Sequence, residues 1–218
     1  MLNTHKIRAG LALPTHTVLE SVKRKLFDFE DYLFEILNGY EFGGVPKEDL
    51  VVGNPISLSH ATGHQAVWCC NLQKLFCEAK KTGYDFENFI DIGSGKGKAC
   101  LFASAKQPFK NIIGIEFSAP LVTIANRNKD KADLKNITFI SADATEFELP
   151  NQTSLVFMYN PFDSVVLEKF ISNNINHFKI HNSVIAYAND IHRLLLVKFG
   201  FEAIFRDQTR KISLYQLS

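Results

Sequence analysis

The sequence has almost no surplus of charge of either sign. Its 24 lysine and arginine residues stand against 23 aspartate and glutamate residues, so the formal net charge is +1. A chain this close to neutrality generates no broad basic field that would attract nucleic acid irrespective of base sequence. The net charge therefore does not indicate a nucleic-acid partner, although it is compatible with small local basic patches.

Cysteine is scarce as well. The four cysteines, Cys69, Cys70, Cys77 and Cys100, form no C-x-x-C pair and have no histidine at zinc-ligand offsets. We therefore expect no metal site, and we expect the cysteines to behave as small buried hydrophobes. Disulfides are not expected in a reducing compartment.

Long apolar runs are missing from the sequence. No stretch approaches the roughly 20 apolar residues that a membrane-spanning helix needs. The first ten residues carry charges and lack the apolar centre of a secretory signal. These absences predict a cytoplasmic protein with no membrane partner.

The length and composition suit a single folded core. With 218 residues and 46% hydrophobic content, the chain can bury one substantial core but is too short for two large domains. No internal repeat or low-complexity segment interrupts it. One domain with an extension is therefore the expectation.

The most informative segment is a glycine-rich loop that follows a short apolar strand. The strand ends at Asp91, and Gly93, Gly95 and Gly97 follow at every second position. Glycine adopts positive φ without steric cost, so this loop can turn sharply and approach a ligand closely. Two nucleotide sites do not fit the spacing. A dinucleotide fingerprint needs its third glycine where Lys98 stands, and a P-loop needs serine or threonine where Gly97 stands.

Three further apolar strands end in polar residues. Glu116 closes the second strand, while Asp143 and Asn160 follow the third and the fourth. Parallel strands place their ligands at their carboxyl ends, so we expect these side chains to gather with Asp91 at one edge of a sheet. Glu116 also stands at about the distance from the glycine loop where a ribose-binding carboxylate is expected.

Together these segments resemble the class I S-adenosylmethionine (SAM) methyltransferases. Residues 91–97 match the D-x-G-x-G-x-G loop of that family, and the four strand ends carry polar groups in the family's order. The resemblance implies SAM as cofactor, S-adenosylhomocysteine as product, and no metal. It implies a cofactor site composed of Asp91, Gly93, Ser94, Gly95, Gly97, Glu116, Phe117, Asp143, Ala144, Asn160 and Thr62.

The resemblance also implies individual roles within this site. Glu116 would hold the two ribose hydroxyls, and Asp143 would hold the adenine amino group unless it simply caps a turn. Thr62 lies in a candidate lid over the methionine moiety of SAM. We expect Lys96 and Lys98, which flank the last glycine, to face solvent or to neutralise the SAM carboxylate.

The motifs are similar to those of a group of small bacterial methyltransferases, distantly similar to Dot1-like lysine methyltransferases. This likeness implies methyl transfer to an amine, with a protein lysine as the first candidate. Asn160 and Phe162 are the catalytic candidates: Asn160 would orient the amine and Phe162 would shape its entry. Asn160 could equally be a polar group that only shapes the SAM pocket. A small-molecule or nucleic-acid acceptor, and a SAM-binding module without catalysis, are the alternatives, and the sequence leaves the acceptor and the oligomeric state unknown.

From about Asp85 onward, apolar strands alternate with helical segments, as a doubly wound α/β fold requires. The last two strands are joined by residues 208–211 alone, which suits an antiparallel hairpin. We predict a Rossmann-like fold with a seven-stranded, mostly parallel sheet and an antiparallel last strand. Strands are expected over residues 88–91, 111–116, 137–141, 155–159, 183–188, 201–207 and 212–216, and helices over residues 98–105, 120–131, 164–176 and 190–199.

The amino-terminal part predicts a helical extension. Residues 18–37 form an amphipathic stretch, and a second helix is expected over residues 63–81. The candidate lid is residues 59–65, which include His64. We divide the chain into an extension with lid, residues 1–83, and a SAM-binding domain, residues 84–218. The apolar stripe of the first helix, expected to pack on a neighbour, is Leu19, Val22, Leu26, Phe29, Leu33 and Ile36.

Overall fold

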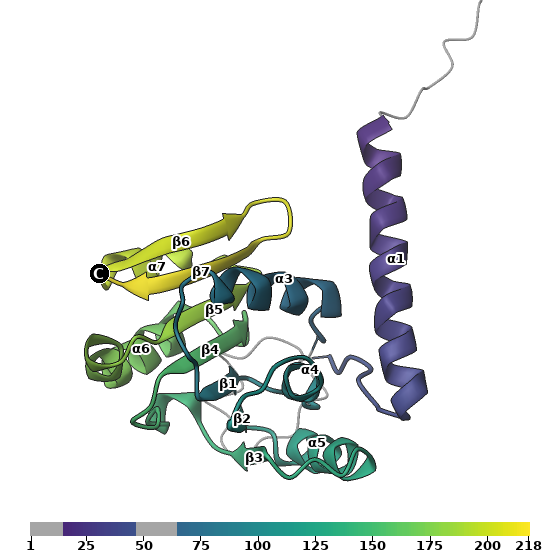
Figure 1. The fold of residues 1–218 in the computed structure, drawn as a ribbon, viewed down its shortest axis with the longest axis horizontal. Helices are drawn as coiled ribbons and strands as arrows, with labels where there is room; N and C mark the ends of the chain where they lie inside the picture. The colour runs from purple at the N-terminus through teal and green to yellow at the C-terminus, as the bar shows by residue number, and fades with distance from the viewer. Residues whose placement is uncertain (1–14, 47–64) are drawn as a thin grey trace, which may run out of the picture.

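The computed structural model describes residues 15–46 and 65–218, with side chains from residue 20 onward. Seven strands form one sheet in the order β3-β2-β1-β4-β5-β7-β6 (Figure 1). The strands are β1 (Asn88–Ile92), β2 (Asn111–Glu116), β3 (Ile137–Ser141), β4 (Ser154–Tyr159), β5 (Val184–Ala188), β6 (Phe201–Asp207) and β7 (Ile212–Leu217). The helices are α1 (Thr15–Asn38), α3 (Cys69–Lys80), α4 (Lys98–Lys106), α5 (Ala119–Lys131), the 3-10 turn η2 (Ala144–Glu146), α6 (Ser164–Ile180) and α7 (Arg193–Lys198).

The strand directions confirm the predicted fold. β1 to β5 pair in parallel, and β7 runs antiparallel to both β5 and β6. The hairpin between β6 and β7 turns at Lys211, where φ is +52°, and Asp207 accepts a hydrogen bond from the Arg210 N–H at 3.0 Å. A tight turn of this kind can join only antiparallel neighbours.

Alternation along the buried strands divides the core into two layers. In β1, Phe89 packs in the layer beneath α3, α4 and α5, whereas Ile90 and Ile92 pack in the layer beneath α6 and α7. This follows from the two-residue period of a strand, which sends successive side chains to opposite faces. β1 is buried along its whole length because helices cover both of its faces.

Helix α1 stands at the side of these layers and is anchored through one of its faces (Figure 1). Its Asp31 carboxylate accepts a hydrogen bond from the backbone N–H of Cys69 at 2.8 Å and forms an ion pair with Lys98. Phe27 packs against Trp68, with 5.7 Å between ring centroids, and Phe34 packs edge-on against Phe102 of α4 at 5.5 Å. Asp31 therefore joins α1 to the first turns of both α3 and α4.

Two expectations about the amino-terminal part are wrong. The helix expected over residues 63–81 begins at Cys69, because the first amide of α3 is held by Asp31 and residues 65–68 are not helical. The apolar stripe of α1 faces away from the sheet, since the anchoring face is Phe27, Asp31 and Phe34, and its packing on a neighbour stays a prediction. Cys77 is exposed on the outer face of α3, whereas Cys69 and Cys100 are buried as expected.

We predict that Asp31→Ala destabilises the protein far more than removal of a surface charge. The substitution leaves the Lys98 ammonium, whose side chain is 6% exposed, without its carboxylate, and it frees the first amide of α3. Loss of a partner in a largely buried pair should lower the free energy of unfolding by about 2–4 kcal/mol. Urea titration measures this. Lys110→Ala, which breaks the exposed Lys110–Glu87 pair, is the control and should change the free energy of unfolding little; equal losses would contradict the anchoring role of Asp31.

Candidate functional site

The glycine loop lies at the carboxyl end of β1, where the predicted ligand edge should be. Gly93, Gly95 and Gly97 have φ values of +78°, +53° and +86°. The N–H groups of Gly93 and Ser94 both donate to the carbonyl of Ile115 in β2, at 2.8 and 2.9 Å. Gly97 then precedes the first residue of α4. The loop thus turns from strand to helix through three left-handed residues that only glycine adopts without strain.

Close packing explains two of these glycines independently of any ligand. A Cβ added at Gly93 would lie 2.3 Å from the Cβ of Pro161, which follows β4. A Cβ added at Gly97 would lie 2.5 Å from the ring of Phe139 in β3. Both distances are far below van der Waals contact, so Phe139 in the middle of β3 and Pro161 after β4 pack directly on the glycine loop.

Glu116 connects the loop to the end of β2. Its carboxylate accepts hydrogen bonds from the backbone N–H of Gly95 at 2.9 Å and of Ser118 at 3.0 Å. The residue is only 5% exposed, and burial raises the pKa of its carboxyl, while the bonds from these N–H groups act to lower it. A buried carboxylate is thereby held in place at the centre of the site.

Asp91 lies beside this group, at 3% exposure. Burial, and next the charge of Glu116, raise the pKa of Asp91 to about 8, although a contact from the Cys100 thiol at 3.8 Å lowers it. At neutral pH the raised pKa favours the protonated form of Asp91.

The end of β4 carries the second polar group of the site. Asn160 is 7% exposed and has a φ of +42°, a left-handed conformation that asparagine tolerates better than most residues. Its side-chain oxygen accepts a hydrogen bond at 3.1 Å from the hydroxyl of Tyr187 in β5. Burial raises the pKa of Tyr187, so this hydroxyl keeps its proton and donates. Tyr187 has no sequence signal for this role beyond its place in an apolar strand.

The remaining predicted residues lie in different surroundings. Asp143 caps η2 by accepting from the N–H and the hydroxyl of Thr145, both at 2.8 Å, which is the turn-capping role considered from the sequence. Ala144 and Phe117 are half-buried beside their strand ends. Phe162 is 8% exposed and packs in the core layer beneath α6 and α7. Thr62 and His64 lie outside the described residues, so their assignments stay predictions, as do the ligand roles of the others.

The two lysines of the loop do not face solvent as expected. Lys96 and Lys98 are 6% and 5% exposed. Lys98 pairs with Asp31 of α1, and Lys96 approaches Glu41, which follows α1, at 3.3 Å between Nζ and Oε1. No local pattern predicts these pairs, because their acids lie more than 50 residues away along the chain.

Asn128 of α5 forms hydrogen bonds that link the chain after α1 to the backbone of the glycine loop. Its side-chain nitrogen donates to the carbonyls of Glu41 and Lys96, each at 3.1 Å, and its oxygen accepts from the Glu41 N–H at 3.0 Å. The chain after α1 is therefore part of the wall of the site. Buried asparagine with three such bonds is well satisfied.

The described residues fit SAM. The Ser94 hydroxyl, within the loop, is buried and has no hydrogen-bond partner among the described residues, so it is available for a polar ligand. Gly114 leaves room for it, because a Cβ there would lie 2.8 Å from the Ser94 oxygen. Glu116 supplies a carboxylate suited to hydroxyl groups, and the left-handed glycines allow close approach. No cluster of three or more potential metal ligands occurs within residues 15–46 and 65–218.

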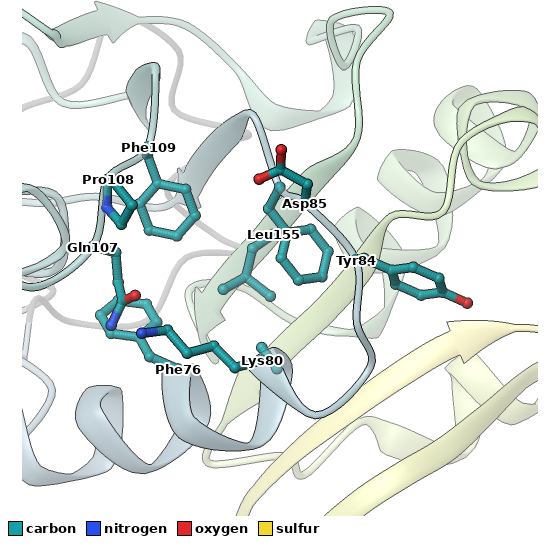
Figure 2. A pocket seen from close by; sticks show the side chains of 10 residues that line it. Phe76, Lys80, Tyr84, Asp85, Gln107, Pro108, Phe109 and Leu155 are labelled. Atoms are coloured by element: carbon teal, nitrogen blue, oxygen red, sulfur yellow. The ribbon is translucent and has the colours of Figure 1, made fainter.

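A separate pocket of about 160 Å³ lies at the opposite edge of the sheet (Figure 2). Aromatic side chains of Phe76, Tyr84 and Phe109 line it, with Leu155 from the start of β4. Because these residues lie at the amino ends of the parallel strands, the pocket is not part of the site around the glycine loop.

The fold and this site define a class I, Rossmann-like SAM-dependent methyltransferase. Residues 85–206, more than half of the chain, match the family described as "Methyltransferase domain", and the chain belongs to that family. No helix within the described part of the chain is both long and apolar enough to cross a membrane.

Solved structures share the fold at low sequence identity. The ribosomal protein L11 methylase of Lactobacillus delbrueckii subsp. bulgaricus is 15% identical, with a TM-score of 0.51, covering 68% of this chain and 80% of that one. Magnesium protoporphyrin IX methyltransferase of Synechocystis PCC 6803, with bound S-adenosylhomocysteine, is 14% identical, with a TM-score of 0.50 and coverages of 69% and 83%.

A curated relative is closer in sequence over a short stretch. The tRNA (guanine-N(7)-)-methyltransferase of Pediococcus pentosaceus is 36% identical over 58 residues, which is 27% of this chain. The match spans 27% of the relative's own length, so most of the relative has no counterpart in the match.

We predict that Gly93→Ala destabilises the protein although it adds only one methyl group. The new Cβ would meet Pro161 at 2.3 Å, and the backbone at φ +78° disfavours a side chain. Overpacking of this kind costs about 1–3 kcal/mol. Thermal unfolding measures the loss. Gly43→Ala, where a Cβ meets nothing within 4 Å, is the matched control and should leave the melting temperature nearly unchanged; a neutral Gly93→Ala would contradict the packing of Pro161 on the loop.

We also predict a pH dependence of stability that depends on Asp91. Because its pKa is raised from 3.8 to about 8, its contribution to stability is fully present below about pH 4 and is lost as pH rises through 8. The wild-type melting temperature should therefore fall between pH 5.5 and 8 by roughly 6–12 °C more than that of Asp91→Asn. Asp85→Asn, at an exposed position, should keep the wild-type profile. Parallel profiles for wild type and Asp91→Asn would contradict the buried, protonated Asp91.

Proposed function

We propose that this protein transfers the methyl group of SAM to a base of RNA, with transfer RNA as the first candidate. Curated relatives of the chain carry the name tRNA (guanine-N(7)-)-methyltransferase, although their matches cover about a quarter of it. These relatives support a nucleic-acid acceptor, which revises the expectation drawn from net charge alone. A protein lysine, implied by the likeness to Dot1-like enzymes, finds no support among them.

The observation that carries this choice is the state of Asn160 and Phe162. The Asn160 side-chain oxygen accepts a hydrogen bond from the Tyr187 hydroxyl, which occupies one of its two acceptor positions and holds the side chain against β5. Shaping an entry requires an exposed ring, but Phe162 is 8% exposed within the core. Both residues therefore suit a role in shaping the site better than a role in handling an amine.

A base nitrogen with a free lone pair makes fewer demands on the enzyme. It needs no deprotonation before attack, so positioning supplies most of the acceleration. Enzymes that act on bases commonly stack the base against aromatic side chains. Tyr159 at the end of β4 and Phe117 after β2 are half-buried aromatic residues at this edge and suit that task.

When bound, SAM supplies an activated methyl group on its sulfonium. The residues of this chain would hold the cofactor and exclude water. Glu116 offers a hydrogen-bond acceptor, and the buried Ser94 hydroxyl offers a polar group that has no partner among the residues the structure describes. The glycine loop allows close approach of the backbone. Lys96 and Lys98 keep the loop against the α1 segment through their ion pairs.

We predict that tritiated methyl from SAM appears in transfer RNA when the protein is incubated with fractionated cell extract. Protein, DNA, transfer RNA, other RNA and metabolites are separated after the reaction and counted, and labelled RNA is digested to identify the methylated nucleoside. Tyr159→Ala should lower the rate at least tenfold while keeping cofactor affinity, if the ring stacks on the base. Thr123→Ala, on the surface of α5, is a control that should keep the full rate.

Other outcomes distinguish the alternatives. Label found only in protein would overturn the RNA proposal in favour of lysine methylation, and label only in metabolites would favour a small-molecule acceptor. Cofactor binding without label in any fraction would favour a SAM-binding module without catalysis.

A further inference from the structure

The outward face of α1 carries a regular apolar stripe. Val22, Leu26, Phe29, Leu33 and Ile36 are 49%, 60%, 58%, 36% and 54% exposed. They follow one another at intervals of four, three, four and three residues, which is the heptad spacing of a coiled-coil seam. Isolated exposed hydrophobic residues need no explanation, but a continuous helical stripe of this kind indicates a binding surface.

The sheet and helices of the described residues do not cover this stripe. The opposite face of α1 already holds the anchor formed by Phe27, Asp31 and Phe34. Rotating the helix to bury the stripe would break the Asp31–Lys98 pair and the bond to the Cys69 amide. A partner that covers the stripe is therefore not the core to which α1 is anchored.

The charges of α1 select a particular occupant. Lys23 and Lys25 flank the amino-terminal half of the stripe, and Glu30 flanks its carboxyl-terminal half. An antiparallel copy of the same helix would place Lys23 of each helix beside Glu30 of the other, in two symmetry-related pairs of opposite charge. An anionic membrane surface is a poorer match, because Asp28 and Glu30 lie along the same helix.

We propose that two copies of this protein associate through α1, packed antiparallel along the stripe. In this arrangement Val22 packs against Leu33 of the second copy, and Leu26 packs against Phe29 of the second copy. Lys23 of each copy then lies beside Glu30 of the other. The two catalytic bodies lie on the outer sides of the helix pair, since each is bound to the far face of its own α1.

This association would also bear on the site. Asp31 binds the first residue of α4, directly after the glycine loop, and Glu41 approaches Lys96 within it. Pairing would hold α1, and with it these two contacts, in place. The inference does not depend on the identity of the methyl acceptor.

Sedimentation equilibrium of the full chain over about 1–200 µM tests the proposal. The wild type should form a dimer, and Leu26→Glu with Leu33→Glu should weaken its dissociation constant at least tenfold while circular dichroism shows retained helix. Leu194→Glu, at another exposed leucine with 72% exposure, is the matched control and should dimerise as the wild type does. A wild-type monomer throughout this range, or a dimer unaffected by the paired glutamates, would overturn the proposal.

Charge reversal tests the orientation. Lys23→Glu and Glu30→Lys should each weaken the dimer, because each places like charges together on both flanks. The double variant restores opposite charges and should recover most of the wild-type affinity. Failure of the double variant to recover would contradict the antiparallel arrangement.

Discussion

The site depends on one buried charge that must be hydrogen-bonded. Glu116 is 5% exposed at the end of β2, and a carboxylate in such a place is costly unless donors surround it. The backbone N–H groups of Gly95 and Ser118 supply those donors, so the glycine loop and the turn after β2 are held together. The same charge contributes to the raised pKa of Asp91. The buried carboxylate of Glu116 thus both holds the glycine loop in position and contributes to the raised pKa of Asp91.

Close packing around the loop adds a second constraint. Pro161 and Phe139 occupy the space that side chains at Gly93 and Gly97 would need, so these glycines serve the packing of the sheet as much as any ligand. The Ser94 hydroxyl is different, because it is a buried polar atom with no hydrogen-bond partner in residues 15–46 and 65–218, which packing does not explain. The combination of a rigid loop and one unsatisfied group is what a preformed cofactor site requires.

The sheet could be predicted from the sequence because its signals are local. The apolar runs mark the strands, the polar residues mark the strand ends, and the short connection at residues 208–211 predicts an antiparallel pair. The predicted β2, β3 and β6 match the structure at both ends. The amino-terminal part could not be predicted in this way. The start of α3, the face of α1 that packs, and the burial of Lys96 and Lys98 all follow from Asp31 and Glu41, which act across more than 35 residues. The motif predicts Phe162 as an entry residue, but a motif does not reveal which core layer a side chain joins.

Titration calorimetry of S-adenosylhomocysteine tests the central claim most directly, namely that the loop and Glu116 form the cofactor site. Glu116→Ala removes a buried acceptor of charge-assisted bonds and should weaken binding at least tenfold, whereas Glu146→Ala, at an exposed position in η2, should bind as the wild type does. Hydrogen exchange of the Gly95 amide shows whether the loop itself remains ordered. Wild-type affinity in a folded Glu116→Ala variant would contradict this account of the site.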